Sequence, residues 1–346
     1  MSLNYVNKMI PISIICPVYN EKKYIAACIE SVWSCDYPKD LMEIIFVDGM
    51  SRDGTREIIA EYQQKLPQIR LIDNPKQTVS PALNMGIKAA QGEYIFRIDA
   101  HAQYPKNYFS VLLQYMIELK ADNVGAVWNT LPPDTSVVSK AIAAVLTTPF
   151  GIGNAYYRIG SKEIRQTDTV PFGCFHKSLF EKIGYFDEEL IRNQDDEFNG
   201  RIIKNGGKIF LIPFVEVNYY GRDTLSKTSK MFYQYGLFKP LVNKKLGTPA
   251  TLRQFVPPLF VITLILTPLL LWILPSLGAV FCSVIALYLL LNFGISLYEA
   301  TQLKCFPIFL LLPVTFFIVH VSYGWGYLTG IVKILRKRPF AVQINR

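Results

Sequence analysis

The chain has 346 residues, which is enough for one large domain or two ordinary ones. Hydrophobic residues make up 51% of it and charged residues only 18%, below the roughly 25% typical of soluble domains. This composition excludes intrinsically disordered, collagen-like and disulfide-scaffold proteins, and it argues against a purely soluble protein.

Charged and apolar residues are unevenly distributed. Residues 1–253 have the composition of an ordinary soluble domain, whereas residues 255–331 carry almost no charge. The net charge is +9, and basic residues gather on both sides of the apolar block, at Lys227, Lys230, Lys239, Lys244, Lys245, Arg253, Lys333, Arg336, Lys337 and Arg338. This placement favours an anionic membrane face as the partner, and no nucleic acid.

The six cysteines and three histidines predict no zinc site. The cysteines form no CxxC pair and the histidines lie far apart in the sequence. We expect reduced cysteines in a cytosolic domain. The apolar stretch 10–19 is short and contains Pro11 and Pro17, so it does not have the pattern of a signal peptide.

The first 130 residues alternate between strand and helix patterns. Short apolar, β-branched runs predict strands at 12–16, 43–47, 69–72, 93–98 and 124–128. Helices are expected between them, with Asn20 as the first N-cap and Ser80 followed by Pro81 as another helix start. This order predicts an α/β fold with a mixed, mostly parallel sheet and helices on both faces.

Polar residues follow three of these strands at the point where each strand ends. The clusters are residues 19–21, 48–53 and 99–101. Because such sheets bind ligands at the carboxyl ends of their strands, we expect the clusters to lie together in one site. Taken alone, each is also compatible with an ordinary turn or helix cap.

The residue types indicate what these clusters could bind. Asp99, with a second ligand at His101, can hold a divalent ion against a diphosphate. Asp48, Ser51 and Asp53 offer carboxylates and a hydroxyl to a nucleoside.

A fourth polar group, residues 194–197, opens a predicted helix that ends at Gly206. Acidic residues in a first turn suit the helix dipole, which is the structural interpretation. The functional interpretation is a general base that takes a proton from a hydroxyl group.

The chain carries motifs at residues 17–21, 47–55 and 97–101, in this order. Together they resemble the family 2 inverting glycosyltransferases of GT-A fold. A narrower resemblance, to the membrane-attached glucosyltransferases of bacterial succinoglycan-type exopolysaccharide synthesis, rests on residues 168–173, 192–199, 206–207 and 235–239. The similarity covers roughly residues 10–240.

The resemblance implies a pocket for the nucleotide of a UDP-sugar. In it, Asp48 would accept a hydrogen bond from the uracil ring. The residues assigned to this pocket are Pro17, Tyr19, Glu21, Asp48, Ser51 and Asp53.

The resemblance also implies that Asp99 holds Mg²⁺ or Mn²⁺ on the diphosphate of the donor. His101 stands where many members have the second aspartate of a DxD motif, and we expect it to contribute to the metal site. Imidazole suits Mn²⁺ better than Mg²⁺, so the sequence leaves the choice of metal open.

For the transfer itself, Asp195 matches the catalytic base of the family's ED motif, in which Gln194 replaces the usual glutamate. Asp196 and Glu197 are further candidates beside the donor sugar or acceptor. Gly173 would let the backbone approach the same sugar. The QxxRW motif of processive cellulose- and chitin-type synthases is absent, which favours the addition of a single sugar.

Three apolar segments, residues 255–274, 277–298 and 305–331, predict the membrane region. A tight hairpin is expected at residues 275–276. Three full crossings would place the basic residues after 332 opposite the N-terminal domain, against the positive-inside rule. We therefore interpret the third, proline-containing segment as broken and re-entrant.

This pattern predicts four parts. They are a GT-A glycosyltransferase domain (1–222), an amphipathic interfacial segment (223–254), a transmembrane region (255–331) and a basic C-terminal tail (332–346).

The predicted function is a membrane-attached inverting glycosyltransferase. It would transfer one sugar, glucose, from UDP-glucose to a polyprenyl-diphosphate-linked saccharide in exopolysaccharide or other cell-surface polysaccharide synthesis. We expect a multi-pass protein of the cell inner membrane with its catalytic domain facing the cytoplasm. Two alternatives stay open: a polyprenyl-phosphate glycosyltransferase, and a non-catalytic, membrane-anchored nucleotide-binding protein.

Overall fold

The structure is a computed structural model that describes residues 10–249 and 251–340. It divides into two compact units. The first comprises residues 10–129 and 156–219, and the second comprises Thr130–Ala155 and Tyr220–Phe340. Both ends of the predicted four-part division, residues 1–9 and 341–346, lie outside the described residues.

Within the described residues, nine strands form one sheet in the order β3-β2-β1-β4-β8-β6-β9-β5, with β7 paired to β9. Strands β1 to β4 are parallel neighbours, and the later strands pair antiparallel. The predicted mixed, mostly parallel sheet is therefore confirmed. The strands are β1 (Ile12–Val18), β2 (Met42–Asp48), β3 (Ile69–Asp73), β4 (Tyr94–Arg97), β5 (Ala102–Gln103), β6 (Asn123–Leu131), β7 (Arg165–Gln166), β8 (Cys174–His176) and β9 (Ile209–Tyr220).

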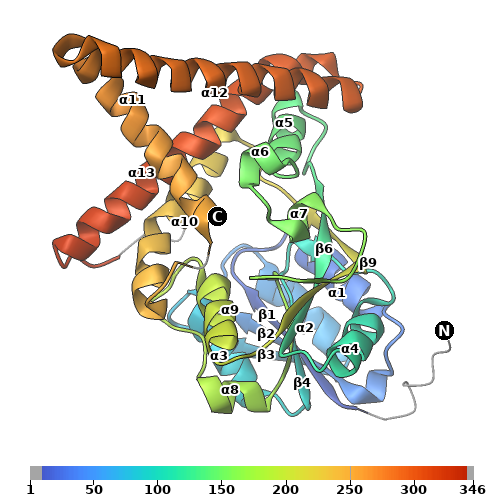
Figure 1. The fold of residues 1–346 in the computed structure, drawn as a ribbon. Coiled ribbons are helices and arrows are strands. Elements are labelled where there is room, and N and C mark those ends of the chain that lie inside the picture. The colour runs from blue at the N-terminus through green and yellow to red at the C-terminus, as the bar shows by residue number, and fades with distance from the viewer. Residues whose placement is uncertain (1–9, 250, 341–346) are drawn as a thin grey trace. The chain divides into compact units, whose positions relative to one another are not determined.

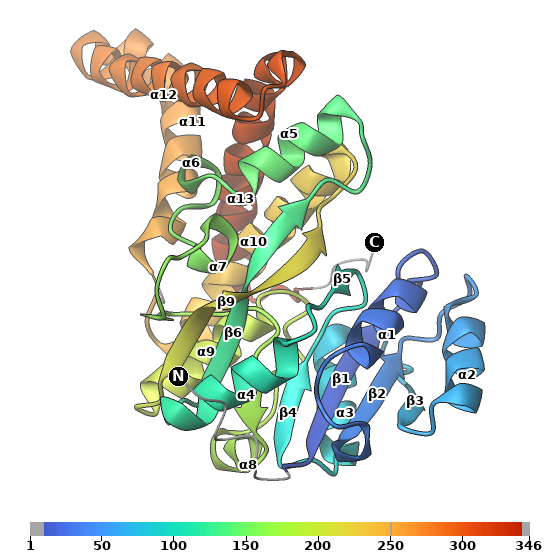
Figure 2. The same ribbon diagram turned by 90° about the vertical axis from the view of Figure 1, so that its right-hand side faces the viewer.

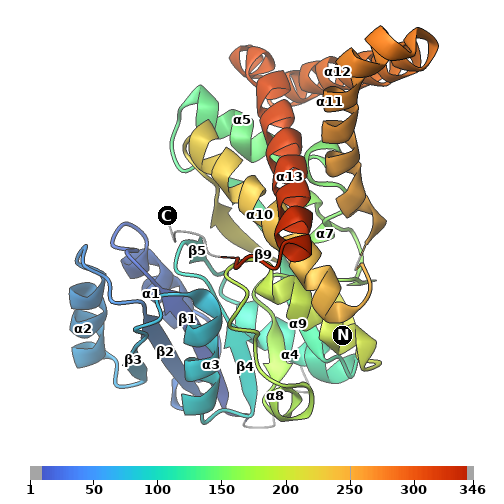
Figure 3. The same ribbon diagram turned by 90° about the vertical axis from the view of Figure 1, so that its left-hand side faces the viewer.

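Helices cover both faces of this sheet (Figures 2 and 3). Side chains alternate along β1, so Ile14 packs with the α1, α2 and α4 side while its neighbour Ile15 packs with the α3, α8 and α9 side. The helices of this unit are α1 (Ile25–Trp33), α2 (Thr55–Lys65), α3 (Val79–Ala89), α4 (Tyr108–Glu118), α7 (Tyr156–Ile159), α8 (Ser178–Ile183) and α9 (Gln194–Lys204), with a short η1 at Lys39–Leu41.

The register of the parallel strands brings their carboxyl ends to one edge. Val18 pairs with Asp48, and Asp48 pairs with Asp73. Arg97, the last residue of β4, pairs with Ile15 of β1. The loops that follow β1, β2 and β4 therefore start close to one another, as the polar clusters predicted.

Two predicted helix caps are wrong, although a helix does start close to Ser80. Asn20 is no N-cap: it has a left-handed φ of 54°, and α1 begins five residues later at Ile25. Its side chain instead accepts a hydrogen bond from the Arg52 N–H. Ser80 lies inside α3, which begins at Val79, and its hydroxyl donates to the Leu190 carbonyl at 2.9 Å. In both cases a longer-range hydrogen bond replaces the local cap.

The second unit consists of helices. Two of its segments, Leu252–Ile273 and Pro275–Gln302, are long and apolar enough to cross a membrane, judged by length and composition. Only 17% and 11% of their most apolar windows are buried, unlike a soluble core helix. The elements are α5 (Val137–Val145), α6 (Pro149–Ile152), α10 (Leu225–Leu246), η2 (Leu252–Phe255), α11 (Val256–Ile273), α12 (Pro275–Gln302), η3 (Phe306–Leu310) and α13 (Leu312–Leu335).

The expected hairpin at residues 275–276 is not antiparallel. Leu274 alone separates α11 from α12, and Pro275 is the first residue of α12. Figures 1 and 3 show α12 running steeply across α11 instead of back along it. Proline at a first helical position starts a new helix at once, so no residues remain for a reversing turn.

The third apolar segment, mostly α13, packs closely against α10. A Cβ on Gly326 would lie 2.1 Å from the Tyr233 carbonyl oxygen, and one on Gly236 would lie 2.0 Å from that of Tyr323. Ser229 and Ser322 add a hydroxyl contact of 2.8 Å. Small residues thus let two helix backbones approach, the packing mode of helices in membranes. The predicted interfacial segment and the third apolar segment form one packed pair.

Candidate functional site

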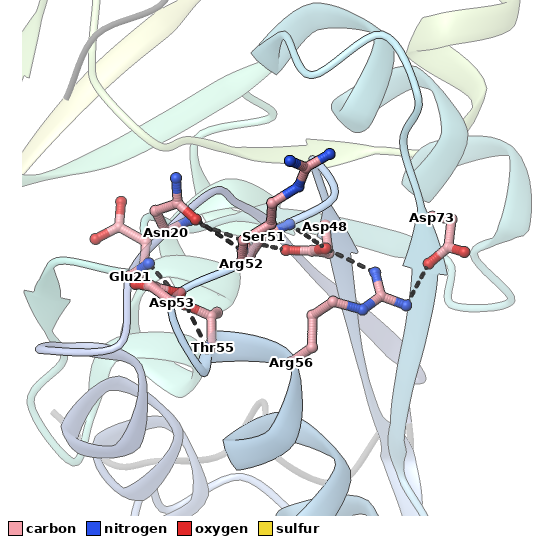
Figure 4. A network of polar contacts seen from close by, with 9 residues as sticks. All are labelled: Asn20, Glu21, Asp48, Ser51, Arg52, Asp53, Thr55, Arg56 and Asp73. Carbon is pink, nitrogen blue, oxygen red and sulfur yellow. Dashed lines mark hydrogen bonds and ion pairs between the residues drawn. The ribbon is translucent and has the colours of Figure 1, made fainter.

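The loops after β1 and β2 are joined by hydrogen bonds (Figure 4). The Asn20 N–H donates to Ser51 Oγ and the Glu21 N–H donates to Thr55 Oγ1, both at 2.8 Å. The Lys22 N–H donates to Asp53 Oδ2 at 3.0 Å. Two motifs about 30 residues apart in the sequence therefore form one surface, as expected for a shared pocket.

Asp48 lies at the centre of this surface, and its side chain is completely buried. Its Oδ1 accepts from the Ser51 hydroxyl at 2.5 Å, and its Oδ2 accepts from the Ser51 N–H at 2.9 Å. Arg56 donates to Oδ2 at 2.7 Å and also to Asp73 at 2.8 Å (Figure 4). Asp48 therefore organises the Ser51 loop through these contacts.

The remaining residues of the predicted nucleotide pocket lie beside this loop. Tyr19 packs on Gly49, where an added Cβ would lie 3.1 Å from its ring, and Pro17 is buried in β1. Burial alone would raise the pKa of Asp53, but hydrogen bonds from Thr55 and the Lys22 N–H outweigh it and lower the pKa. The Asp53 carboxylate is thereby held ionised in its loop.

The end of β4 presents Asp99 and His101. His101 Nδ1 lies 3.4 Å from Asp99 Oδ1 and 3.6 Å from Glu21 Oε1. Tyr104 fixes the Asp99 backbone, because its hydroxyl accepts from the Asp99 N–H at 2.7 Å and lies 3.1 Å from the Asp99 carbonyl oxygen. The third polar cluster thus meets the first one through Glu21.

These side chains fit a divalent ion that is shared with a ligand. Within residues 10–249 and 251–340, no three His, Cys, Asp or Glu side chains are arranged as a complete protein-only metal site. Mg²⁺ is often bound through one or two carboxylates plus substrate phosphates and water, and here Asp99 would supply one carboxylate and His101 an imidazole nitrogen. Such an ion would neutralise charge on a diphosphate leaving group.

Asp195, in the first turn of α9, faces Arg97 at the end of β4. Arg97 Nη1 lies 2.7 Å from Asp195 Oδ2. Although 30% of the Asp195 side chain is exposed, burial is the largest influence on its carboxyl group and raises its pKa. Arg97 opposes this shift, whereas the charges of Asp196 and Asp99 add to it. A raised pKa suits a carboxylate that must accept a proton near neutral pH.

The neighbouring acidic residues differ from Asp195. Glu197 is buried and holds Arg201 with two hydrogen bonds of 2.7 and 2.9 Å. Arg201 in turn donates to the carbonyls of Ile183 and Tyr185, so this pair ties α9 to the end of α8. Asp196 is half-buried. These contacts favour Asp195 and Asp196 over Glu197 as groups that face an acceptor.

Gly173 stands beside Arg97 at a constrained point of the backbone. Its carbonyl accepts from the Arg97 N–H at 3.0 Å, and its φ is +69°. An added Cβ would lie 2.6 Å from both Asn123 Oδ1 and the Phe175 ring. The preceding residue, Phe172, also has a positive φ of 65°. Backbone conformations of this kind are uncommon for phenylalanine and are concentrated at functional sites.

Comparison with known proteins identifies the family. The sequence model of "Glycosyl transferase family 2" matches residues 13–184. A Methanococcus voltae protein, "Dolichyl N-acetyl-alpha-D-glucosaminyl phosphate 3-beta-D-2,3-diacetamido-2,3-dideoxy-beta-D-glucuronosyltransferase", is 31% identical over 93% of this chain and 97% of its own. The chain belongs to glycosyl transferase family 2. The family predicted from the motifs is thus confirmed, and the protein is an enzyme of the glycosyltransferase class.

One further relative agrees with this family assignment, and one solved structure agrees with the fold. The "Succinoglycan biosynthesis protein ExoA" of Rhizobium meliloti is 29% identical over 70% of this chain and 73% of its own. The solved structure of the "Mannosyltransferase PcManGT from Pyrobaculum calidifontis in complex with GDP-Man and Mn2+" is 18% identical. It covers 96% of this chain and 88% of its own, with a TM-score of 0.58. That likeness supports the GT-A fold.

Three residues of this family 2 site were not assigned a role from the sequence. Arg97 was noticed only as the first residue of a motif, although a charge at the end of a buried strand was a usable signal. Arg56 and Tyr104 carried no such signal, because an arginine in a helix and a tyrosine in a loop are common. Their roles depend on contacts with Asp48 and Asp99.

Proposed function

We propose that this family 2 enzyme is a membrane-attached, inverting glycosyltransferase. It transfers a single sugar from a UDP-sugar, UDP-glucose in our proposal, to a lipid-linked saccharide in exopolysaccharide or other cell-surface polysaccharide synthesis. The main support for this proposal is the contact between Arg97 and Asp195, in which Nη1 lies 2.7 Å from Oδ2. This contact lies beside the pair formed by Asp99 and His101. A candidate base thus lies next to a candidate diphosphate site.

The donor binds across the edge of the sheet in this proposal. Its nucleotide contacts the loops after β1 and β2, with Pro17, Tyr19, Glu21, Asp48, Ser51 and Asp53 around it. Asp99 and His101 hold the divalent ion on the diphosphate. The hydrogen bonds between Asn20, Ser51 and Thr55 support this arrangement, since they preassemble the loops before a ligand arrives.

The acceptor approaches from the α9 side. Asp195 removes the proton of an acceptor hydroxyl, whose oxygen then forms a bond to the anomeric carbon as the bond to the nucleoside diphosphate breaks. A single in-line displacement inverts that carbon, so an α-linked donor gives a β-glycoside. Gly173 lets the backbone approach the sugar and Asp196 lies beside it, whereas Glu197 is bonded to Arg201.

A lipid-linked acceptor is supported by the second unit and by one relative. The helices α11 and α12 offer apolar surface for a bilayer. The name of the Methanococcus voltae relative describes a dolichyl phosphate that already carries a sugar. This favours a saccharide-bearing lipid over a bare polyprenyl phosphate as the acceptor of this chain.

We further propose a multi-pass protein of the cell inner membrane with its catalytic unit facing the cytoplasm. The lysines of α10 and its neighbourhood support that orientation through the positive-inside rule. The predicted division into residues 1–222, 223–254, 255–331 and 332–346 stays part of this proposal.

Acceptor specificity tests the function. Full-length protein in detergent would receive UDP-glucose and one acceptor: polyprenyl-diphosphate-linked saccharide, bare polyprenyl phosphate or the free saccharide. We expect a β-linked product on the saccharide-bearing lipid alone. Transfer to bare polyprenyl phosphate would replace the proposed acceptor, and binding of UDP without transfer from any UDP-sugar would contradict the catalytic proposal.

A further inference from the structure

Arg97 is placed by three separate constraints. Its backbone N–H is bonded to the Gly173 carbonyl at 3.0 Å, its guanidinium lies 5.5 Å from the centre of the Phe172 ring, and its Nη1 contacts Asp195 at 2.7 Å. Only 9% of its side chain is exposed. A planar guanidinium fixed in this way presents its donors in one orientation.

The ion pair is asymmetric, because Arg97 is buried whereas 30% of the Asp195 side chain is exposed. The pair therefore lies with the arginine inside and the carboxylate toward the solvent side. Arg97 Nη1 contacts Oδ2 of Asp195 at 2.7 Å.

Burial of Arg97 is not explained by hydrogen bonding alone. Within the described residues, its buried Nε has no hydrogen-bond partner. Buried polar groups that serve only the fold are nearly always paired, and each exception calls for an explanation. Stacking on Phe172, whose own backbone is held at a φ of 65°, keeps the arginine in this partly unsatisfied position.

We propose that Arg97 is a positioning residue for the catalytic base Asp195. This inference rests on the proposed function, in which Asp195 takes the acceptor proton. Arg97 fixes the direction of the carboxylate so that Oδ1 points to the acceptor oxygen. It also favours the ionised form of Asp195, against the burial and the negative charge of Asp196 that disfavour it.

A double-mutant cycle separates this role from direct contact with the donor. The variants are Arg97→Gln, Asp195→Asn and the double variant, made in the full chain and assayed with UDP-glucose and the lipid-linked acceptor. Loss of a base typically costs about 10²- to 10⁴-fold in rate, and misplacement of a catalytic group costs up to about 10²-fold. We expect Arg97→Gln to lower kcat by about 10- to 100-fold with little change in the donor KM.

The double variant gives the deciding comparison. If Arg97 acts through Asp195, the double variant is no slower than Asp195→Asn alone, because no base remains to be positioned. If the losses in kcat of the two single variants multiply in the double variant, and the donor KM rises, then Arg97 binds the donor. That result would overturn the proposal. Wild-type kcat in Arg97→Gln, with Asp195→Asn inactive, would overturn it while leaving the proposed function intact. Full activity in Asp195→Asn would instead overturn the base assignment.

Two further variants keep the test independent of folding. Arg97→Lys retains the charge without the planar fork, and we expect partial activity with kcat between those of wild type and Arg97→Gln. Arg70→Gln removes an arginine that pairs with Glu43 at 3.0 Å on the same sheet, outside the proposed site. Arg70→Gln therefore shows what the loss of an ion pair elsewhere on the sheet does to activity. We expect its kcat to equal that of the wild type.

The pH profile provides a readout that a purely structural arginine would not move. Because Arg97 is the cation that lowers the pKa of Asp195, Arg97→Gln is expected to shift the acid limb of kcat to higher pH. If the Arg97→Gln protein folds and binds UDP but the acid limb of its kcat profile is unshifted, the positioning role is contradicted.

Discussion

Arg56 lies 2.7 Å from Asp48, an aspartate whose side chain is completely buried at the end of β2. The same arginine, in the first turn of α2, reaches Asp73 at the end of β3, so one side chain joins α2 to two parallel strands. This bridge is the centre of the candidate nucleotide pocket, and it carries the first prediction.

Replacing Arg56 by glutamine should destabilise the protein and weaken UDP binding. The change leaves the buried Asp48 carboxylate without its cation, and lost hydrogen bonds to charged groups typically cost about 1.5–3 kcal/mol. Thermal unfolding in detergent and UDP titration would measure both effects. Arg70→Gln is the control, because it removes a more exposed ion pair and should leave UDP binding unchanged. Equal effects of the two variants on UDP binding would count against the pocket.

Replacing Gly173 by alanine should harm both folding and transfer. Its φ of +69° costs an L-residue about 1 kcal/mol or more, and the new Cβ would meet Asn123 and Phe175 at 2.6 Å. Gly160→Ala separates these causes, since Gly160 has a φ of +87° with nothing within 4 Å of an added Cβ. We expect a small drop in melting temperature for Gly160→Ala and a larger one, with lost activity, for Gly173→Ala. Similar melting temperatures would show that crowding at Gly173 is unimportant.

The rate of transfer should fall on the acid side of neutrality. Asp195 must be ionised to accept a proton, and burial raises its pKa above the ordinary value of about 3.9. Activity is therefore lost as the pH falls through that raised pKa, which is higher than for an exposed aspartate. A pH profile of kcat at saturating donor and acceptor would measure it. If the acid limb of the kcat profile instead lay at the ordinary pKa of aspartate, this would argue against a desolvated base.

Changing His101 to aspartate should alter the metal preference. In the proposed site an imidazole and the Asp99 carboxylate hold the ion, and imidazole suits Mn²⁺ better than the harder Mg²⁺. The ratio of activity with Mn²⁺ to activity with Mg²⁺ should be lower in His101→Asp than in the wild type, and a chelator should abolish transfer in both. An unchanged ratio would remove His101 from the metal site.

Replacing Gly326 by leucine should disrupt the α10–α13 pair. Even a Cβ at this position would lie 2.1 Å from the Tyr233 carbonyl, and overpacking typically costs about 1–3 kcal/mol. Gly294→Leu on α12 is the matched control, because nothing lies within 4 Å of an added Cβ there. Size-exclusion chromatography after heating in detergent should show loss of Gly326→Leu protein at lower temperature. Equal survival of both variants would exclude close packing at Gly326.

The sequence predicts β1 to β4 and β6 well because each contains a short apolar run, whereas β5, β7, β8 and β9 were not predicted. The run at 12–16 becomes β1 (Ile12–Val18), and the run at 43–47 becomes β2 (Met42–Asp48). Helix starts were harder to predict. Asn20 and Ser80 have the residue types of N-caps, but both bond to distant segments, and local propensity contains no information about such partners.

The candidate site was predictable as a set of motifs and not as a set of contacts. Asp99 and His101 follow a strand in the sequence, so their proximity was expected. The contact of Arg97 with Asp195 joins residues 98 positions apart and depends on how α9 meets the sheet. The close approach of α10 and α13 likewise depends on glycines that are meaningful only once both helices are placed.

The most direct test of this account is the rate of UDP release from UDP-glucose with a lipid-linked saccharide acceptor and Mn²⁺. Wild type would be compared with Asp195→Asn and Asp99→Ala in detergent. We predict turnover that requires the acceptor, a loss of about 10²- to 10⁴-fold in Asp195→Asn with UDP binding kept, and a loss of activity in Asp99→Ala. Undiminished turnover in Asp195→Asn would contradict the account and move the base to Asp196.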